Sequence, residues 1–162
     1  ECRNKVPQEI MKRFQRPNYG EVNSRLRWIL KDIPVQRKGV ILRDPHEIFI
    51  SACNRRAKEY WHSHLKHLSD SLKRLDSSIE ATDCKLIYVS KMVTDIAYLM
   101  EILEFFEITD VEVTAKDIKN KVNANSKPVL TTWSELPLGL KHKAEHAFQW
   151  FREKYNLGSE II

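Results

Sequence analysis

Apolar residues recur at helical spacing along most of this chain. The clearest start signal is Asp44, Pro45 and Glu47, which give an N-cap acid, a proline at the first helical position and an acid in the first turn. From there an apolar stripe continues in steps of three and four: Ile50, Cys53, Ala57, Trp61, His64, Leu68, Leu72 and Leu75. The stripe predicts one helix of about seven turns over residues 45–75, with Trp61 at the buried centre of the fold.

Residues 83–106 carry apolar side chains on more than half of a helical circumference. This pattern predicts either one central, largely buried helix or two helices divided near Thr94 and Asp95, a possible cap pair. The stripe on residues 45–75 is too long for short neighbours to cover. We therefore expect residues 83–106 to run back along it as the antiparallel partner of a long helical hairpin.

The ends of the chain predict shorter elements. Short helices are expected after Pro7 and over residues 22–32, and residues 34–44 are expected to form a loop that lays the extended patch 40–42 across the core. A last helix begins near Leu138 and is stopped by Asn156 and Gly158. Its apolar stripe is Leu140, Ala144, Ala147, Phe148, Phe151 and Tyr155.

Two helix-start signatures follow each other closely in residues 108–122. Thr109 precedes Glu112 by three residues, and Thr114 precedes Asp117 by three residues. Each pair is a capping-box arrangement, in which the hydroxyl and the acid satisfy free backbone N–H groups. The segment is therefore expected to hold two very short helices in series, a layout typical of small helical interaction domains.

Together these patterns predict an all-α fold. Only four Gly and six Pro occur in 162 residues, which is few for a chain of many strands and tight turns. We expect a single compact bundle of seven or eight helices over residues 1–162, with basic N-terminal helices and a loop in 1–46 and the helical core in 47–162. Because the chain begins with Glu1, we expect it to be a fragment of a larger protein. Its oligomeric state is left open.

Composition bears on the compartment and on membranes. The apolar runs all fall short of the roughly 18 residues that a membrane span needs. The three cysteines, Cys2, Cys53 and Cys84, are odd in number and lack metal-type spacing. Free cysteines within apolar patterns favour a reducing compartment, either nuclear or cytosolic.

Positive charge is concentrated at the N-terminus. Residues 1–46 hold eleven Lys and Arg against five acids, whereas the rest of the chain is nearly balanced. The segment is either a solvated face of two short helices or a nucleic-acid or nucleosome contact that binds phosphates through counterion release. The candidate residues for that contact are Lys12, Arg13, Arg16, Arg25, Arg27 and Lys31.

The chain offers little for catalysis. His142, Glu145 and His146 fit the HxxEH pattern of inverted zinc proteases, but the few residues that follow supply no convincing third ligand. His64 and His67 share a helix face without a carboxylate or cysteine at matching spacing. Gly-rich phosphate loops and the GxSxG motif are absent from the sequence. We therefore predict a non-enzymatic protein without a metal or a cofactor.

Residues 99–136 supply a resemblance. The residues that carry it are Leu99, Leu103, the pair Ile108–Thr109, Thr114, the step Ile118, Val122 and Asn123, and a later Trp133. Their pattern is similar to the helical N-terminal domain of transcription elongation factor S-II, a family that includes the integrase-binding domain of lens-epithelium-derived growth factor. The resemblance implies a nuclear, chromatin- or transcription-associated module that binds other proteins through short acidic segments with a Phe or Leu anchor. The expected groove residues are Trp133, Leu136, Phe148 and Phe151, and the expected basic rim is Lys116, Lys119, Lys121 and Lys127.

Overall fold

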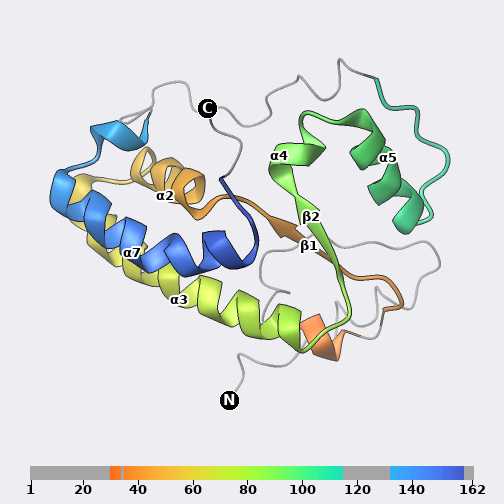
Figure 1. Cartoon of the computed structure of the whole chain (residues 1–162), viewed down its shortest axis with the longest axis horizontal. Helices are drawn as coiled ribbons and strands as arrows, with labels where there is room; N and C mark the ends of the chain where they lie inside the picture. Colours follow the sequence, from red (N-terminus) through yellow and green to blue (C-terminus); the bar gives the residue numbers. More distant parts are fainter. Residues whose placement is uncertain (1–29, 34, 115–131, 159–162) are drawn as a thin grey trace.

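The structure, a computed structural model, describes residues 30–33, 35–114 and 132–158 (Figure 1). The described part contains five α-helices, three short 3-10 helices and two strands. In chain order these are η3 Leu30–Asp32, β1 Gly39–Leu42, α2 Pro45–Cys53, η4 Lys58–Tyr60, α3 Trp61–Glu80, β2 Lys85–Tyr88, α4 Val89–Met92, α5 Ile96–Phe105, η5 Trp133–Glu135 and α7 Leu138–Lys154.

The prediction of an all-α bundle of seven or eight helices is wrong. β1 and β2 pair in parallel, with Val40 opposite Leu86 and Leu42 opposite Tyr88. Parallel strands need a crossover connection, and α2 and α3 provide it here. The four-residue apolar runs that form the strands are too short for their spacing to distinguish a strand from part of a helix or loop.

The sheet separates two layers. Val40, Leu42, Leu86 and Tyr88 belong to or pack against the main core formed with α2, α3 and α7. On the opposite face, a Cβ atom at Gly39 would lie 2.8 Å from the side chains of Ile87 and Phe106, so this face packs closely against the end of α5. Figure 1 shows α2, α3 and α7 on one side of the strands and α4 and α5 on the other.

The main core confirms two of the sequence predictions. Trp61 is 3% exposed, as expected of the buried centre of the stripe. α7 begins at Leu138, buries one apolar face and ends before Asn156, whose positive φ of 50° reverses the chain. The N–H of Leu157 then donates to the carbonyl of Arg152 at 2.8 Å, the hydrogen bond that closes a Schellman motif.

The long helix over residues 45–75 is not continuous. Asp44 caps α2 as predicted, because its side chain accepts a hydrogen bond from the N–H of His46 at 2.8 Å, but α2 ends at Cys53. The indole Nε1 of Trp61 donates to the carbonyls of Cys53 and Arg56, at 3.2 and 3.3 Å. The Cys53 carbonyl also accepts from the N–H of Arg56 at 3.4 Å, so Trp61 adds a second donor at the end of α2 and one donor in the turn that follows, and the apolar spacing continues across the break.

The predicted antiparallel hairpin is also wrong, because residues 83–106 form β2, α4 and α5 in succession. The division near Asp95 is confirmed: its carboxylate accepts a hydrogen bond from the N–H of Tyr98 at 3.2 Å and caps α5. Tyr98 in turn ties α5 to the sheet, since its hydroxyl accepts from the N–H of Tyr88 and donates to the carbonyl of Leu86.

The first of the two short helices predicted in residues 108–122 is absent, since residues 108–114 have no helical structure. Glu107 has a φ of 56° and ends α5 in a Schellman motif, with the N–H of Ile108 donating to the carbonyl of Leu103. The second capping box extends beyond the described residues. So do the predicted N-terminal helices, apart from residues 30–32, which form the 3-10 turn η3.

Candidate protein-interaction surface

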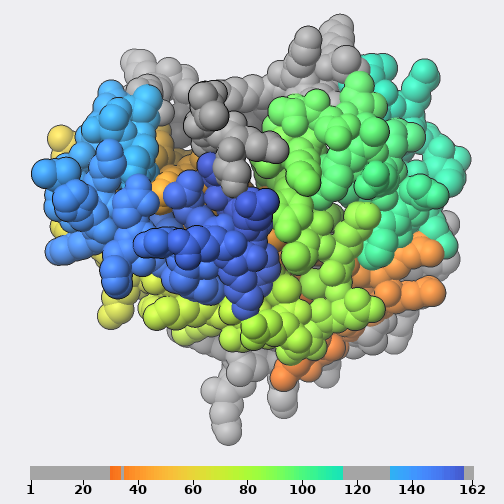
Figure 2. Space-filling view, viewed as in Figure 1, coloured from red at the N-terminus to blue at the C-terminus, as the bar shows by residue number. Residues whose placement is uncertain are grey.

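The chain doubles back after α5 and forms an open groove with it. Because Glu107 reverses the chain, residues 108–114 run along the outer side of α5 toward its beginning (Figure 1, Figure 2). The hollow between them has a volume of about 560 Å³. We call it the α5 groove; its lining residues are Ile96, Met100, Thr109, Asp110, Val111, Glu112 and Val113.

Exposed apolar side chains line part of the α5 groove. Among the described residues eight large hydrophobic side chains are exposed, and five of them fall between residues 93 and 111: Val93, Ile96, Met100, Ile108 and Val111, at 37 to 47%. Three of these five, Ile96, Met100 and Val111, line the groove. Exposed apolar side chains gathered beside polar groups are typical of a protein-binding site.

The charged side chains that line the α5 groove are acidic. Residues 92–114 contain six acids and no Lys or Arg, although Glu101, Glu104 and Glu107 lie near Lys85 or Arg37 on the other side of the helix. Asp110 and Glu112 line the groove directly, and Asp95 caps the helix that forms its wall. A ligand that brings positive charge beside apolar side chains would satisfy both properties of the groove.

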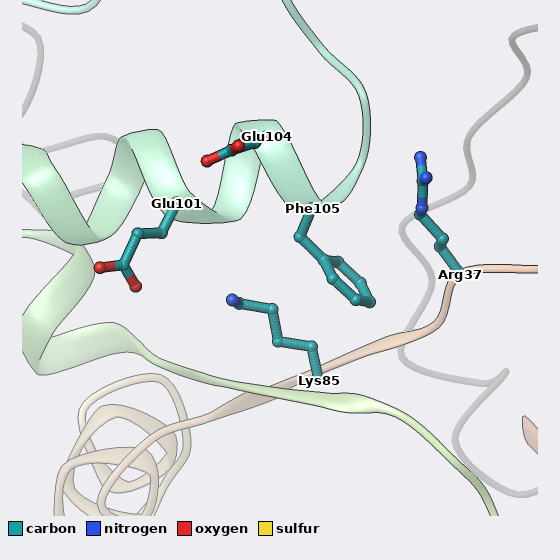
Figure 3. A pocket seen from close by; sticks show the side chains of 5 residues that line it. All are labelled: Arg37, Lys85, Glu101, Glu104 and Phe105. Carbon is teal, nitrogen blue, oxygen red and sulfur yellow. The ribbon is translucent and has the colours of Figure 1, made fainter.

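A second hollow lies on the other side of α5 (Figure 3). Its volume is about 330 Å³, and it is lined by Arg37 before β1, by Lys85 from β2, and by Glu101, Glu104 and Phe105 from α5. Lys85 Nζ lies 5.3 Å from the Phe105 ring centroid, and Arg37 is hydrogen-bonded to Glu107, which raises the pKa of Arg37 and lowers that of Glu107. Its charges of both signs lie close together and partly compensate each other, so the hollow selects no ligand charge.

The densest polar cluster joins α2 to α7. Arg152 Nε lies 3.2 Å from the buried carboxylate of Asp44, and Glu145 accepts a hydrogen bond from Trp133 Nε1 at 3.1 Å. The ring of His46 stacks on Trp133, with 3.9 Å between centroids. Its Nε2 lies 3.2 Å from Glu145 Oε2 but makes no well-directed hydrogen bond and is buried.

Burial and the positive charge of Arg152 lower the pKa of His46, although Glu145 and Asp44 oppose this shift. The neutral imidazole is therefore favoured. Gly158, at a φ of 85°, packs directly on Arg152 and Asp44, since a Cβ atom there would lie 2.0 Å from Arg152 Nη2. Gly158 thus covers Arg152 and Asp44, and the cluster connects α2, η5 and α7.

The groove residues expected from the resemblance do not form an open surface. Leu136, Phe148 and Phe151 are buried in the main core, at 5, 0 and 1% exposed. Trp133 is half-buried against His46. The helix spacing that suggested these residues is the spacing of the core-facing side of α7. The expected rim residues Lys116, Lys119, Lys121 and Lys127 lie outside the described residues.

The candidates for nucleic-acid contact also fall largely outside the described residues. Only Lys31 is described, and it is exposed on η3; the others, Lys12, Arg13, Arg16, Arg25 and Arg27, lie in residues 1–29. In the HxxEH stretch, His142 and His146 are exposed while Glu145 is engaged with Trp133 and His46. Within the described ranges, groups of three or more His, Cys, Asp and Glu with metal-site geometry do not occur.

Comparisons of the chain with family models, curated proteins and solved structures found no match. Among the described helices, none combines the length and the apolar character that crossing a bilayer requires.

The α5 groove is not predicted from the sequence, because the apolar excess of residues 83–106 indicates burial. One signal was available. The overlapping residues 92–114 carry six acids and no Lys or Arg, and charged side chains are rarely buried, so part of the apolar surface beside them is expected to be exposed.

Proposed function

We propose that this chain is a non-enzymatic module that binds another protein at the α5 groove. The observation that carries the proposal is the concentration of exposed apolar side chains on α5 and residues 108–113, within a stretch whose only charges are negative. The nuclear, chromatin- or transcription-associated setting rests on the sequence resemblance over residues 99–136 alone.

Charge complementarity favours a short basic segment with apolar anchors as the partner. Apolar side chains would fill the hollow beside Met100 and Val111, and Lys or Arg would approach Asp110 and Glu112. This partner has the opposite charge to the acidic segments that the resemblance implies. The difference arises because the described groove is acidic, whereas the predicted basic rim lies in residues 116–127.

The proposal is tested with two labelled 14-residue peptides. Both carry Leu at positions i, i+4, i+7 and i+11; one has Lys and the other Glu at the remaining positions. Fluorescence anisotropy should show binding of the Lys peptide and little of the Glu peptide. Amide shifts in the NMR spectrum should concentrate in residues 93–114.

Variants locate the binding. Met100→Gln together with Val111→Thr removes apolar contacts at two exposed sites and should weaken the Lys peptide about tenfold or more. Leu138→Ser is the matched control, because Leu138 is the most exposed large hydrophobic residue described and lies on α7. Equal binding of both peptides, shifts confined to residues 132–158, or self-association of the chain that the double variant abolishes would each overturn the proposal.

A further inference from the structure

Thr109 has acidic neighbours in a pattern that no other serine or threonine of this chain shares. From Glu107 to Glu112 the chain reads EITDVE, which places acids one and three residues after the Thr109 hydroxyl. Every other Ser and Thr in the sequence lacks an acid at one or both of these positions. Because charge patterns select the substrates of protein kinases, this spacing fits a Ser/Thr kinase whose substrate cleft is basic.

The structure leaves Thr109 accessible to such an enzyme. Residues 107–112 are all exposed, and residues 108–114 belong to no helix or strand. The backbone of residues 109–113 makes no hydrogen bond with the described parts of the chain. The Thr109 hydroxyl donates to the exposed carboxylate of Asp110 at 3.2 Å. A kinase can therefore draw this stretch away from α5 without breaking a backbone hydrogen bond to the described residues.

Thr94 provides a comparison in the same region. It is exposed and is followed by Asp95, but it lacks the second acid. Its hydroxyl donates to the carbonyl of Ser90 at 2.8 Å, and Asp95 caps α5. Asp110 and Glu112, in contrast, form no ion pair with a described residue, so a basic cleft can engage both carboxylates.

A phosphate on Thr109 would change the charge of the α5 groove. Thr109 is the one hydroxyl-bearing residue among those that line the groove, and the lining charges are the carboxylates of Asp110 and Glu112. A phosphate adds about −1.5 to −2 charges at pH 7, so the negative charge lining the groove would roughly double. Residues 92–114 contain no Lys or Arg, and Arg37 is already hydrogen-bonded to Glu107, which leaves the phosphate open to cations of a bound partner.

We propose that Thr109 is the target of a Ser/Thr protein kinase that selects acids after its target, and that its phosphorylation strengthens binding of the basic partner at the α5 groove. The second part of this inference rests on the proposed function. In the transfer, the Thr109 hydroxyl oxygen attacks the γ-phosphorus of ATP and the bond from that phosphorus to the β-phosphate oxygen breaks. The kinase's catalytic base takes the hydroxyl proton, and the products are phosphothreonine and ADP.

Mass spectrometry of the whole chain tests the modification site. The chain is incubated with MgATP and either a kinase that selects acids after its target or one that selects Arg before it; only the first should place a phosphate on Thr109. Thr109→Val should abolish this phosphate, Asp110→Asn with Glu112→Gln should lower its rate at least about tenfold, and Thr94→Val is the control that should change nothing. Equal phosphorylation of Thr94, or an unchanged rate in the Asp110 and Glu112 variant, would overturn the assignment.

Fluorescence anisotropy with the Lys and Glu peptides tests the regulation. Phosphorylation should raise the affinity for the Lys peptide about fivefold in 50 mM salt and less in 200 mM salt, because salt screens exposed charges. Treatment with a phosphatase should restore the affinity of the unmodified chain. An unchanged or lowered affinity overturns the regulatory role. If the Lys peptide binds neither form, the proposed function fails and the regulatory role with it, whereas the phosphate found on Thr109 still decides whether that residue is the kinase target.

Discussion

Replacing Trp61 tests the account of the broken helix most directly. The indole contributes in two ways: its rings fill the main core, and its Nε1 donates to the carbonyls of Cys53 and Arg56. Trp61→Ala removes both contributions and should lower the free energy of unfolding by about 3 to 5 kcal/mol. Trp61→Phe keeps most of the apolar volume but leaves the two carbonyls without the indole donor, which should cost about 1 to 3 kcal/mol.

Urea unfolding followed by circular dichroism at 222 nm measures both variants without relying on tryptophan fluorescence. With an m-value of about 2 kcal/mol per molar urea, Trp61→Ala should lower the midpoint by about 1.5 to 2.5 M. Tyr60→Ala is the control one residue away. Its exposed side chain predicts a change within about 0.5 kcal/mol.

Two results would refute this reasoning. If Trp61→Ala costs less than about 1 kcal/mol, the indole does not lie at the centre of the core. If Trp61→Phe unfolds as readily as Trp61→Ala, the hydrogen bonds to Cys53 and Arg56 outweigh the packing, and the break between α2 and α3 depends on them. The two variants together separate these contributions, which the alanine substitution alone does not.

Three further predictions concern burial at single sites. The pKa of His46 is lower in the folded state, so the folded protein binds fewer protons than the unfolded protein, and the free energy of unfolding should fall as pH drops through about 6.5. The variant His46→Phe, which keeps a ring against Trp133, should show a smaller fall in the free energy of unfolding between pH 7.5 and 5.5. Gly39→Ala places a Cβ 2.8 Å from Ile87 and Phe106 and should cost about 1 to 3 kcal/mol in urea unfolding. Burial raises the pKa of the Cys53 thiol to about 11, so in a variant whose other cysteines are serine, Ellman's reagent at pH 8 should leave it unmodified until urea unfolds the chain.

The sequence predicts well those elements whose boundaries are set by local chemistry. Asp44 and Pro45 start α2, Asp95 starts α5, and Asn156 ends α7, each through a hydrogen bond or a backbone angle within a few residues. The apolar stripe of α7 also suffices, because one side of this helix faces the core along its whole length.

Long-range contacts account for the failures. The pairing of β1 with β2 joins residues more than forty positions apart, and neither run alone is long enough to show its period. The break after Cys53 is bridged by an indole eight residues later. The α5 groove arises because Glu107 adopts a positive φ, which a capping pattern over Thr109 and Glu112 does not reveal. Spacing alone also cannot separate a buried Phe148 from a groove residue, since both lie on the apolar side of a helix.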